Sequence, residues 1–358
     1  MYTDALTNSV AASSPKAATR DQLGRMLRDL RISVTDRCNF RCTYCMPKDV
    51  FGADYPYLPK SEILSFEEIV RIVRVFASLG MEKLRLTGGE PLLRRDLPSL
   101  IHQLSAVTGL KDMALTTNGA ALSALARPLR QAGLNRLTVS VDALDDATFK
   151  SMNDADFPVQ RVLRGIDAAL SAGFDRIKIN MVVKKGLNED QLVPMARHFS
   201  GPQYILRFIE YMDVGSTNGW QLKDVVPAAE IIRQLNRELN LEPVTANYDG
   251  EVARRFICRD SETEIGIIAS VTQPFCRGCT RARLSADGQL YTCLFAHAGH
   301  DLKSLLRTPR VSDDDLALAV RTIWQARNDR YSEQRFKISA TSLASDKMPR
   351  AEMSRLGG

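Results

Sequence analysis

Residues 31–47 read RISVTDRCNFRCTYCMP, and the prediction of the fold starts from this stretch. Its beginning belongs to Leu30–Thr35, a run rich in β-branched residues that predicts a strand. Cys38, Cys42 and Cys45 follow with the spacing C-x3-C-x2-C, so we expect them on a loop at the carboxyl end of that strand. Three soft thiolates at this spacing can hold three corners of an iron–sulfur cube and leave its fourth iron open. Structural zinc is the alternative, but it takes four protein ligands, and no fourth Cys or His lies nearby.

Short β-rich runs alternate with helical patterns around and beyond these cysteines. Strands are predicted at Leu30–Thr35, Lys83–Thr87, Asp112–Thr116, Arg136–Val141, Arg176–Val183 and Tyr204–Glu210. Helices are predicted between them at Phe66–Leu79, Leu97–Val107, Leu122–Ala132, Val159–Ala172 and Glu189–Phe199. Strands that are each followed by a crossover helix imply a parallel sheet. The segment lengths suit an α/β fold, a partial (β/α)6 TIM-like barrel, with a doubly wound open sheet as the alternative. In both arrangements, the carboxyl ends of the strands face the ligand.

The pattern changes after a helix predicted at Glu230–Asn240. The predicted elements that follow are short antiparallel strands at Val244–Tyr248, Arg254–Cys258 and Ile265–Ala269, a hairpin that turns at Asp287-Gly288, and a helix at Asp313–Arg327. We therefore divide the chain into three regions: a flexible N-terminal tail over residues 1–25, the barrel over 26–240, and an α+β extension over 241–358 that covers the open side of the barrel.

A second cysteine group lies in the C-terminal region. Cys276, Cys279 and Cys293 have the spacing C-x2-C-x13-C, and the predicted hairpin can fold Cys293 back onto the other two. Three ligands rather than four again favour a cluster with an open iron. Candidates for a fourth ligand of an alternative zinc site are His297, His300 and Cys258. Of these, Cys258 falls on an apolar strand, which is more typical of a buried packing thiol.

The 358 residues include 44% hydrophobic and 25% charged side chains, a composition typical of a globular protein. It excludes collagen-like, mucin-like and wholly disordered chains, and no apolar run approaches the ~18 residues of a membrane span. Seven cysteines, six of them in two tight groups, favour cluster binding in a reducing compartment over a secreted disulfide framework. Residues 1–20 contain no apolar segment typical of a signal peptide, so we expect a cytoplasmic protein. The net charge of +6 suits an anionic small molecule as well as a nucleic acid.

The first cysteine group resembles that of the radical S-adenosylmethionine superfamily, in which an aromatic residue precedes the last cysteine, as Tyr44 does here. The resemblance implies a [4Fe-4S] cluster on this group, with S-adenosylmethionine chelated to its open iron. One electron from the cluster would cleave S-adenosylmethionine to a 5′-deoxyadenosyl radical, which abstracts hydrogen from the substrate. By the same resemblance, the S-adenosylmethionine site is lined by Tyr44, Gly89, Ser140 and Met212.

The residues at the predicted strand ends agree with a ligand site. Thr87-Gly88-Gly89-Glu90-Pro91 closes the second predicted strand, where two glycines let the backbone approach a ligand and Glu90 can accept a hydrogen bond from an ammonium group. Each feature has a structural alternative: a tight turn for the glycines, a capping hydroxyl for Ser140, and a packing side chain for Met212.

Within that superfamily the chain resembles the GTP 3′,8-cyclases of molybdenum cofactor biosynthesis from about Leu30 to its end. The resemblance rests on residues 31–47, LRLTGGEPL at 84–92, LTTNG at 115–119, the second cysteine group with its Arg-x-Arg, and the terminal Gly357-Gly358, which in this family reaches the active site. It implies a second [4Fe-4S] cluster on Cys276, Cys279 and Cys293, whose open iron holds the guanine. The positions that match GTP contacts are Arg31, Arg85, Thr116, Lys178, Arg281 and Arg283.

The reaction implied by the resemblance converts GTP to (8S)-3′,8-cyclo-7,8-dihydroguanosine 5′-triphosphate. The radical takes the ribose 3′ hydrogen, and C3′ then attacks C8 of guanine. No side chain is expected to act as a catalytic residue, because the radical comes from S-adenosylmethionine, while Arg281 and Arg283 position the substrate. The implied partners are flavodoxin or a similar reductant and, for hand-off of the product, cyclic pyranopterin monophosphate synthase. No nucleic acid or membrane is expected to bind.

Charge supports an anionic substrate independently of the resemblance. Basic side chains that point into a barrel call for an anionic partner, and Arg31, Arg85 and Lys178 lie on predicted strands. Arg281 and Arg283 share one face of a strand, and guanidinium groups suit phosphates and purine edges. Solvated outward positions are the alternative for each of them. Two competing functions stay open: a peptide-modifying radical enzyme, and a non-enzymatic interaction protein with two zinc knuckles.

Overall fold

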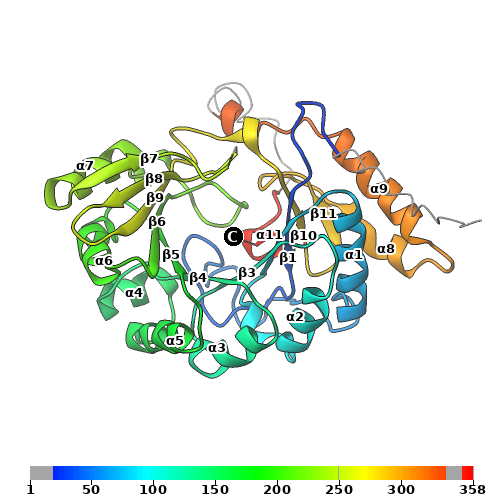
Figure 1. Cartoon of the computed structure of the whole chain (residues 1–358), viewed down its shortest axis with the longest axis horizontal. Helices are drawn as coiled ribbons and strands as arrows, with labels where there is room; N and C mark the ends of the chain where they lie inside the picture. The colour runs from blue at the N-terminus through cyan, green and yellow to red at the C-terminus, as the bar shows by residue number, and fades with distance from the viewer. Residues whose placement is uncertain (1–18, 249, 336–348, 358) are drawn as a thin grey trace, which may run out of the picture.

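A computed structural model describes residues 19–248, 250–335 and 349–357 (Figure 1). Most of the tail expected over residues 1–25 lies outside these ranges. Residues 19–25, however, are packed into the folded body, where Arg20 forms a β-bridge with Met26. Asp21 and Arg25 are both buried and form an ion pair of 2.5 Å. The expectation of a tail is therefore wrong for this segment.

Twelve strands of the described residues form one continuous sheet. In chain order they are β1 (Asp29–Ser33), β2 (Lys83–Thr87), β3 (Asp112–Thr117), β4 (Arg136–Ser140), β5 (Ile177–Val183), β6 (Tyr204–Glu210), β7 (Leu241–Val244), β8 (Arg254–Cys258), β9 (Thr263–Ile268), β10 (Arg281–Leu284), β11 (Gln289–Tyr291) and β12 (His300–Asp301). Their order in the sheet is β12-β11-β10-β1-β2-β3-β4-β5-β6-β9-β8-β7. Strands β1 to β6 pair in parallel and in sequence order, which confirms the predicted partial (β/α)6 barrel.

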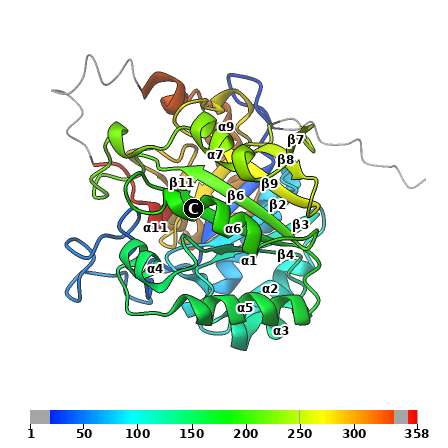
Figure 2. The same cartoon turned by 90° about the vertical axis from the view of Figure 1, so that its left-hand side faces the viewer.

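Helices surround the outer face of this curved sheet (Figures 1 and 2). They are α1 (Phe66–Ser78), α2 (Leu97–Ser105), α3 (Leu122–Gln131), α4 (Asp146–Asn153), α5 (Val159–Ser171), α6 (Leu192–His198), α7 (Ala228–Glu238), α8 (Leu302–Arg307) and α9 (Asp313–Gln325). A further helix, α11 (Met353–Leu356), lies inside the ring. Helix α1 shows why they form: Ser65 and Glu68 make a capping box, and an apolar stripe that includes Val73 and Phe76 is buried. Helices α4, α8 and α11 were not predicted. In the described parts of the chain, none of the helices is long and apolar enough to cross a membrane.

The C-terminal strands extend the barrel wall at both of its edges. Strand β9 pairs in parallel with β6, and β10 pairs in parallel with β1. The hairpin that turns at Asp287-Gly288 is confirmed, because β10 and β11 are antiparallel. The strand predicted at Val244–Tyr248 is wrong. Strand β7 ends at Val244, where its pairing with β8 ends, and Tyr248 instead lies against Lys83, whose Nζ is 3.5 Å from the ring centre.

The inside of the ring is polar, although parallel strands covered by helices are usually apolar on both faces. The large apolar cluster, with side chains such as Phe76, Ile101 and Phe174, packs between the sheet and the helices. The C-terminal helix α11 lies within the ring in Figure 1, and the Ser33 hydroxyl of β1 donates a hydrogen bond of 2.7 Å to the Arg355 carbonyl. This polar interior holds the candidate site.

Candidate active site

One cavity inside the barrel contains both cysteine groups. The residues predicted for the site that line it are Cys38, Cys42, Cys45, Cys276, Cys279, Cys293, Tyr44, Gly89, Ser140, Met212, Arg31, Arg85, Thr116, Arg281 and Arg283. Lys178, Cys258, His297 and His300 do not line it. Cys258 lies in the apolar core on β8 with an exposed fraction of 3%, which confirms that it is a packing thiol.

The first cysteine group lies on the loop that follows β1, as predicted. Cys38 Sγ accepts hydrogen bonds from the Phe40 backbone N–H (3.4 Å) and the Asn118 side-chain amide (3.9 Å). Burial raises the pKa of the Cys38 thiol to about 11. Burial also raises the pKa of the thiols of Cys42 and Cys45. Buried thiols of this kind become thiolates at neutral pH when a metal binds them. Three soft donors, with N–H groups directed at sulfur, fit an iron–sulfur cluster.

The Gly88-Gly89 turn after β2 packs against the backbone that leads into the first cysteine group. A Cβ atom on Gly88 would overlap the Thr35 carbonyl oxygen, and one on Gly89 would overlap that of Arg37. The N–H groups of Gly89 and Glu90 donate hydrogen bonds of 3.0 and 2.8 Å to these same two oxygens. The close approach that the sequence suggested for a ligand is therefore made by the chain itself.

Glu90 ties this turn to the end of β3. Its carboxylate accepts hydrogen bonds from the N–H groups of Leu92 (3.0 Å) and Asn118 (2.7 Å) and from the Thr117 hydroxyl (2.7 Å). Burial raises the pKa of Glu90 to about 7. The sequence suggested that Glu90 accepts a hydrogen bond from an ammonium group. Such a group would share the Glu90 oxygens with these three protein donors.

Replacing Gly89 with Ala is expected to displace the first cysteine group and to lower the iron that it binds. The added methyl meets backbone rather than a flexible side chain, and such overpacking costs ~1–3 kcal/mol. Iron and sulfide per chain after anaerobic reconstitution measure the effect. The matched control is Gly52→Ala, whose new Cβ would meet the Lys48 carbonyl at an ordinary 3.5 Å. Equal iron content in both variants would show that the close packing has no such role.

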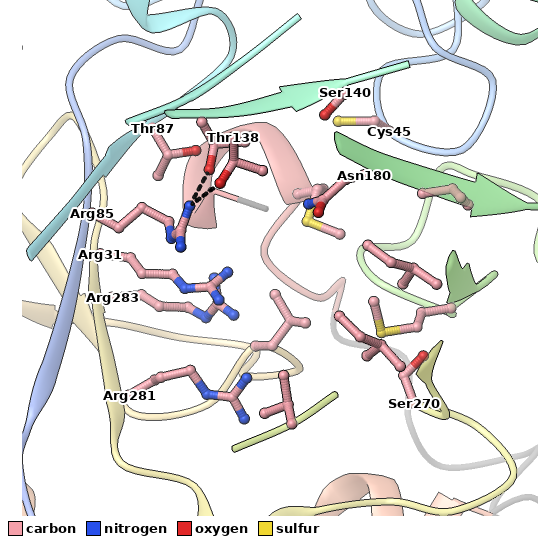
Figure 3. Close-up of a pocket in the computed structure, with 18 of the residues that line it drawn as sticks. Arg31, Cys45, Arg85, Thr87, Thr138, Ser140, Asn180, Ser270, Arg281 and Arg283 are labelled. Carbon is pink, nitrogen blue, oxygen red and sulfur yellow. Dashed lines mark hydrogen bonds between the residues drawn. The ribbon is translucent and has the colours of Figure 1, made fainter. Parts of the chain in front are cut away.

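Tyr44, Ser140 and Met212 line the same cavity as the first cysteine group, and Figure 3 places Ser140 beside Cys45. The Tyr44 hydroxyl donates a hydrogen bond of 2.7 Å to Asp142 Oδ2. Burial raises the pKa of Asp142 to about 6. Sequence analysis missed Asp142, although a carboxylate directly after a buried strand was an available signal.

The second cysteine group is assembled by the β10–β11 hairpin, which brings Cys293 to Cys276 and Cys279. Cys279 Sγ accepts hydrogen bonds from the guanidinium groups of Arg281 (3.3 Å) and Arg327 (3.2 Å). Burial raises the pKa of Cys279, but the two guanidinium groups outweigh it and lower the pKa to about 6. Burial raises the pKa of Cys293 to about 11. Thiol donors beside cationic N–H groups suit an anionic iron–sulfur cluster.

The thiols do not converge as ligands of one ion. Within residues 19–248, 250–335 and 349–357, no three Cys, His, Asp or Glu side chains are placed to hold a single metal ion. A cubane cluster binds each thiolate at a different iron, so its ligands surround a larger volume. Of the two histidines considered as further ligands, His300 is exposed on β12.

Arg283, Arg31 and Arg85 form a row across the cavity wall (Figure 3). The register of the parallel strands places Arg31 of β1 opposite Arg85 of β2 on one side and Arg283 of β10 on the other. Burial and mutual repulsion lower the pKa of Arg31 well below its usual value, and they lower that of Arg283 to about 9. Arg136 nearby has an ion-pair partner in Asp112, but in the described part of the chain no carboxylate pairs with the three arginines of the row.

Hydroxyl groups and further basic side chains lie next to this row of arginines. Arg85 Nη1 donates hydrogen bonds to the hydroxyls of Thr116 (2.8 Å) and Thr138 (3.0 Å). Lys178 does not line the cavity, although it lies on the same face of β5 as the lining residue Asn180. Burial and the repulsion of Arg207 and other cations lower its pKa to about 6. Sequence analysis missed Arg207, a cavity-lining residue of β6 whose Nε is buried without a hydrogen-bond partner. A basic residue within an apolar strand was the signal that could have identified it.

The C-terminal segment 349–357 ends beside the arginine row. Arg283 Nη1 donates hydrogen bonds to the carbonyl oxygens of Leu356 (3.1 Å) and Gly357. Gly357 packs so closely on Thr87 that a Cβ atom would overlap that side chain. This placement agrees with the expectation that the end of the chain reaches the site; Gly358 lies outside the described residues.

Comparisons with known proteins divide the chain into two matched regions. Residues 32–199 match the family described as Radical SAM superfamily, and residues 204–333 match Molybdenum Cofactor Synthesis C. The GTP 3′,8-cyclase of Acidothermus cellulolyticus is 55% identical over 319 residues, which cover 88% of this chain and 88% of that protein. That of Staphylococcus epidermidis is 46% identical over 344 residues, which cover 96% of this chain and 100% of that protein.

Solved structures with a similar fold include Streptococcus suis SuiB bound to S-adenosylmethionine. Its TM-score is 0.58 at 14% sequence identity, over 87% of this chain and 68% of that one. The structure of SuiB bound to the precursor peptide SuiA has a TM-score of 0.56 at 15% identity, over 87% of this chain and 67% of that one. At such identities the likeness concerns the fold alone. The relatives at 46–55% identity cover most of the chain, which therefore belongs to the GTP 3′,8-cyclase family.

Proposed function

We propose that this chain converts GTP to (8S)-3′,8-cyclo-7,8-dihydroguanosine 5′-triphosphate, the first step of molybdenum cofactor biosynthesis. The observation that carries the proposal is the row of Arg283, Arg31 and Arg85 in one cavity with both cysteine groups. Adjacent buried guanidinium groups without carboxylate partners are unfavourable unless an anion neutralises them. A nucleoside triphosphate supplies that charge, and the names of the curated relatives agree with GTP.

The first half of the site would hold the radical-generating groups. Cys38, Cys42 and Cys45 would bind a [4Fe-4S] cluster, and Tyr44, Gly89, Ser140 and Met212 would line the S-adenosylmethionine site. When bound, these groups supply the one-electron chemistry that removes the 3′ hydrogen of GTP. The protein supplies position: Glu90 fixes the turn beside the cysteine loop, and Asp142 holds the Tyr44 ring in one orientation.

The second half of the site would hold the substrate. Cys276, Cys279 and Cys293 would bind a second [4Fe-4S] cluster with its open iron toward guanine. GTP would be contacted by Arg31, Arg85, Thr116, Lys178, Arg281 and Arg283. Lys178 does not line the cavity itself, and its pKa is lowered to about 6, so the charge of a bound triphosphate would favour its protonated form. A nucleotide held at its base and its phosphates has little freedom at the ribose, which favours bond formation between C3′ and C8.

The partners and the cellular compartment are inferred from the cofactors and the cysteines. We propose flavodoxin or a similar reductant as the electron donor, and hand-off of the product to cyclic pyranopterin monophosphate synthase. All seven cysteines are free, which is consistent with a reducing compartment, and we place the protein in the cytoplasm.

The direct test is anaerobic incubation of the reconstituted protein with GTP, S-adenosylmethionine and dithionite. We expect 5′-deoxyadenosine together with a nucleotide of the mass of GTP but with a changed absorption spectrum. The mass is unchanged because the hydrogen atom that C3′ loses to 5′-deoxyadenosine is replaced, after cyclisation, by one electron from the reductant and one proton. Cleavage of S-adenosylmethionine that leaves GTP unchanged, while another substrate is consumed, would exclude the proposed activity.

Arg281→Ala and Arg283→Ala are expected to weaken GTP binding or turnover by about 10- to 100-fold while both clusters still assemble, because each loses charge-assisted hydrogen bonds. Steady-state kinetics and iron content measure the two effects. Arg254→Ala is the control, since Arg254 is an exposed arginine on β8. Normal GTP kinetics in both variants would remove these two residues from the substrate site.

A further inference from the structure

A buried arginine that the proposed reaction does not use holds the second cysteine group. Arg327, just after α9, donates from Nη1 to the Cys279 carbonyl (2.8 Å) and from Nη2 to Cys279 Sγ (3.2 Å). Its side chain is 1% exposed, and its guanidinium carbon lies 4.5 Å from the centre of the Trp324 ring. A guanidinium enclosed in this way keeps its N–H group at the sulfur.

The N-terminal segment anchors this arginine. Asp21, whose side chain is 0% exposed, accepts a hydrogen bond of 2.5 Å from Arg25 Nε and one of 3.4 Å from Arg327 Nη1. Arg25 Nη1 in turn donates to the carbonyl of Cys276 at 2.9 Å. One buried carboxylate therefore fixes two guanidinium groups, and each of them holds one cysteine of the C-x2-C turn.

The network places positive charge at the sulfur. Arg281 is a second cationic donor to Cys279 Sγ, and Arg25, which lines the cavity, has an Nη2 that is buried without a hydrogen-bond partner. The hydrogen bonds to Cys38 of the first group, in contrast, come from a neutral backbone N–H and a neutral side-chain amide. Reduction makes a cluster more negative, so N–H donors and positive charge at its sulfurs raise its reduction potential.

We propose that Arg327, locked by Asp21, is a positioning residue that holds Cys279 and raises the reduction potential of the second cluster. The segment over residues 19–28 then helps to hold the second cluster, although it lies outside both matched family regions. The inference rests on the proposed function, because it requires a cluster on the second cysteine group.

The test uses the full chain with Cys38, Cys42 and Cys45 replaced by Ala, so that the EPR signal comes from the second cluster alone. In this parent, Arg327→Gln is expected to shift the reduction equilibrium about tenfold toward the oxidised form, which is a midpoint lower by about 59 mV for a one-electron couple. Arg327→Lys keeps the charge without the two-pronged contact and is expected to recover part of the shift. An unchanged midpoint in Arg327→Gln would overturn the proposal.

Asp21→Asn tests the lock. Loss of the carboxylate charge alone would raise the midpoint of the cluster, whereas release of Arg327 would lower it. We expect the release of Arg327, which lies at the sulfur, to outweigh the loss of charge, so the midpoint of Asp21→Asn should be lower. In the Arg327→Gln background, Asp21→Asn should no longer lower the midpoint, because only the loss of the carboxylate charge remains. A further decrease equal to that of Asp21→Asn alone would show that Asp21 does not act through Arg327. If Arg327→Gln fails to fold, Arg327→Lys and Asp21→Asn carry the measurement.

Two further measurements separate this inference from the proposed function. Arg255→Gln removes a largely buried guanidinium that lies outside the cavity and pairs with Glu264 at 3.0 Å, and it should leave the midpoint unchanged. A shift in this control equal to that of Arg327→Gln would count against a specific role for Arg327. Absence of iron from the parent itself would refute the second cluster, and with it the proposed function.

Discussion

Replacing Arg31 with Leu is expected to lower kcat/KM for GTP by about 10²- to 10⁴-fold, since two charge-assisted hydrogen bonds contribute ~1.5–3 kcal/mol each. The same change is expected to stabilise the protein by roughly 1–4 kcal/mol in the absence of GTP, because an apolar side chain replaces a buried charge. Arg31 lies between Arg85 and Arg283 in the strand register, and their repulsion adds to the cost of burial. Kinetics and thermal unfolding of one anaerobic preparation measure both effects.

Arg255→Leu is the matched control for this loss of an arginine. Arg255 has a carboxylate partner in Glu264, whose side chain is 4% exposed. Its removal leaves this buried carboxylate with only one ion pair among the described residues, to Arg176 at 3.2 Å, and should lower the melting temperature. GTP kinetics should not change, because Arg255 lies outside the cavity. If the melting temperature of Arg31→Leu is at or below that of the unchanged protein, the arginine row does not destabilise the protein in the absence of an anion, and our interpretation of the row is wrong.

The double variant Cys276→Ala/Cys279→Ala is expected to lose all cyclisation of GTP while it still cleaves S-adenosylmethionine. It should also bind about half of the iron of the unchanged protein, because only the first cysteine group keeps its three thiols. Iron analysis, release of 5′-deoxyadenosine and product mass from one reaction give all three results.

Two further cysteine variants are controls for that experiment. Cys42→Ala should abolish both the cleavage and the cyclisation, because the first group then lacks a ligand. Cys258→Ala should leave the iron content unchanged, since Cys258 is packed in the core and does not line the cavity. Cyclisation of GTP by the Cys276→Ala/Cys279→Ala variant would show that the second group is dispensable.

The strands of the barrel were predictable because their signal is local. The predicted bounds Lys83–Thr87, Tyr204–Glu210 and Arg254–Cys258 match β2, β6 and β8, which are short runs that contain Leu, Ile or Phe. Strand β7 was misplaced because β8 determines its position, and pairing of this kind is not visible in a short window.

The packed N-terminal segment and Arg327 were missed for a related reason. Asp21 and Arg25 have no apolar periodicity around them, and Arg327 is the last residue of a predicted helix, so all three resemble solvated charges in the sequence. Their burial depends on one another: the carboxylate compensates both guanidinium groups only after the end of α9 has come back to the start of the chain.

The sequence by itself determined that two groups of three thiols exist and where each lies relative to a strand, because a spacing of a few residues limits what the cysteines can bind. Only the tertiary structure decided that Arg31 faces Arg283 as well as Arg85. This arrangement requires β10 to return and pair with β1, which brings distant parts of the chain together and places both cysteine groups in one cavity.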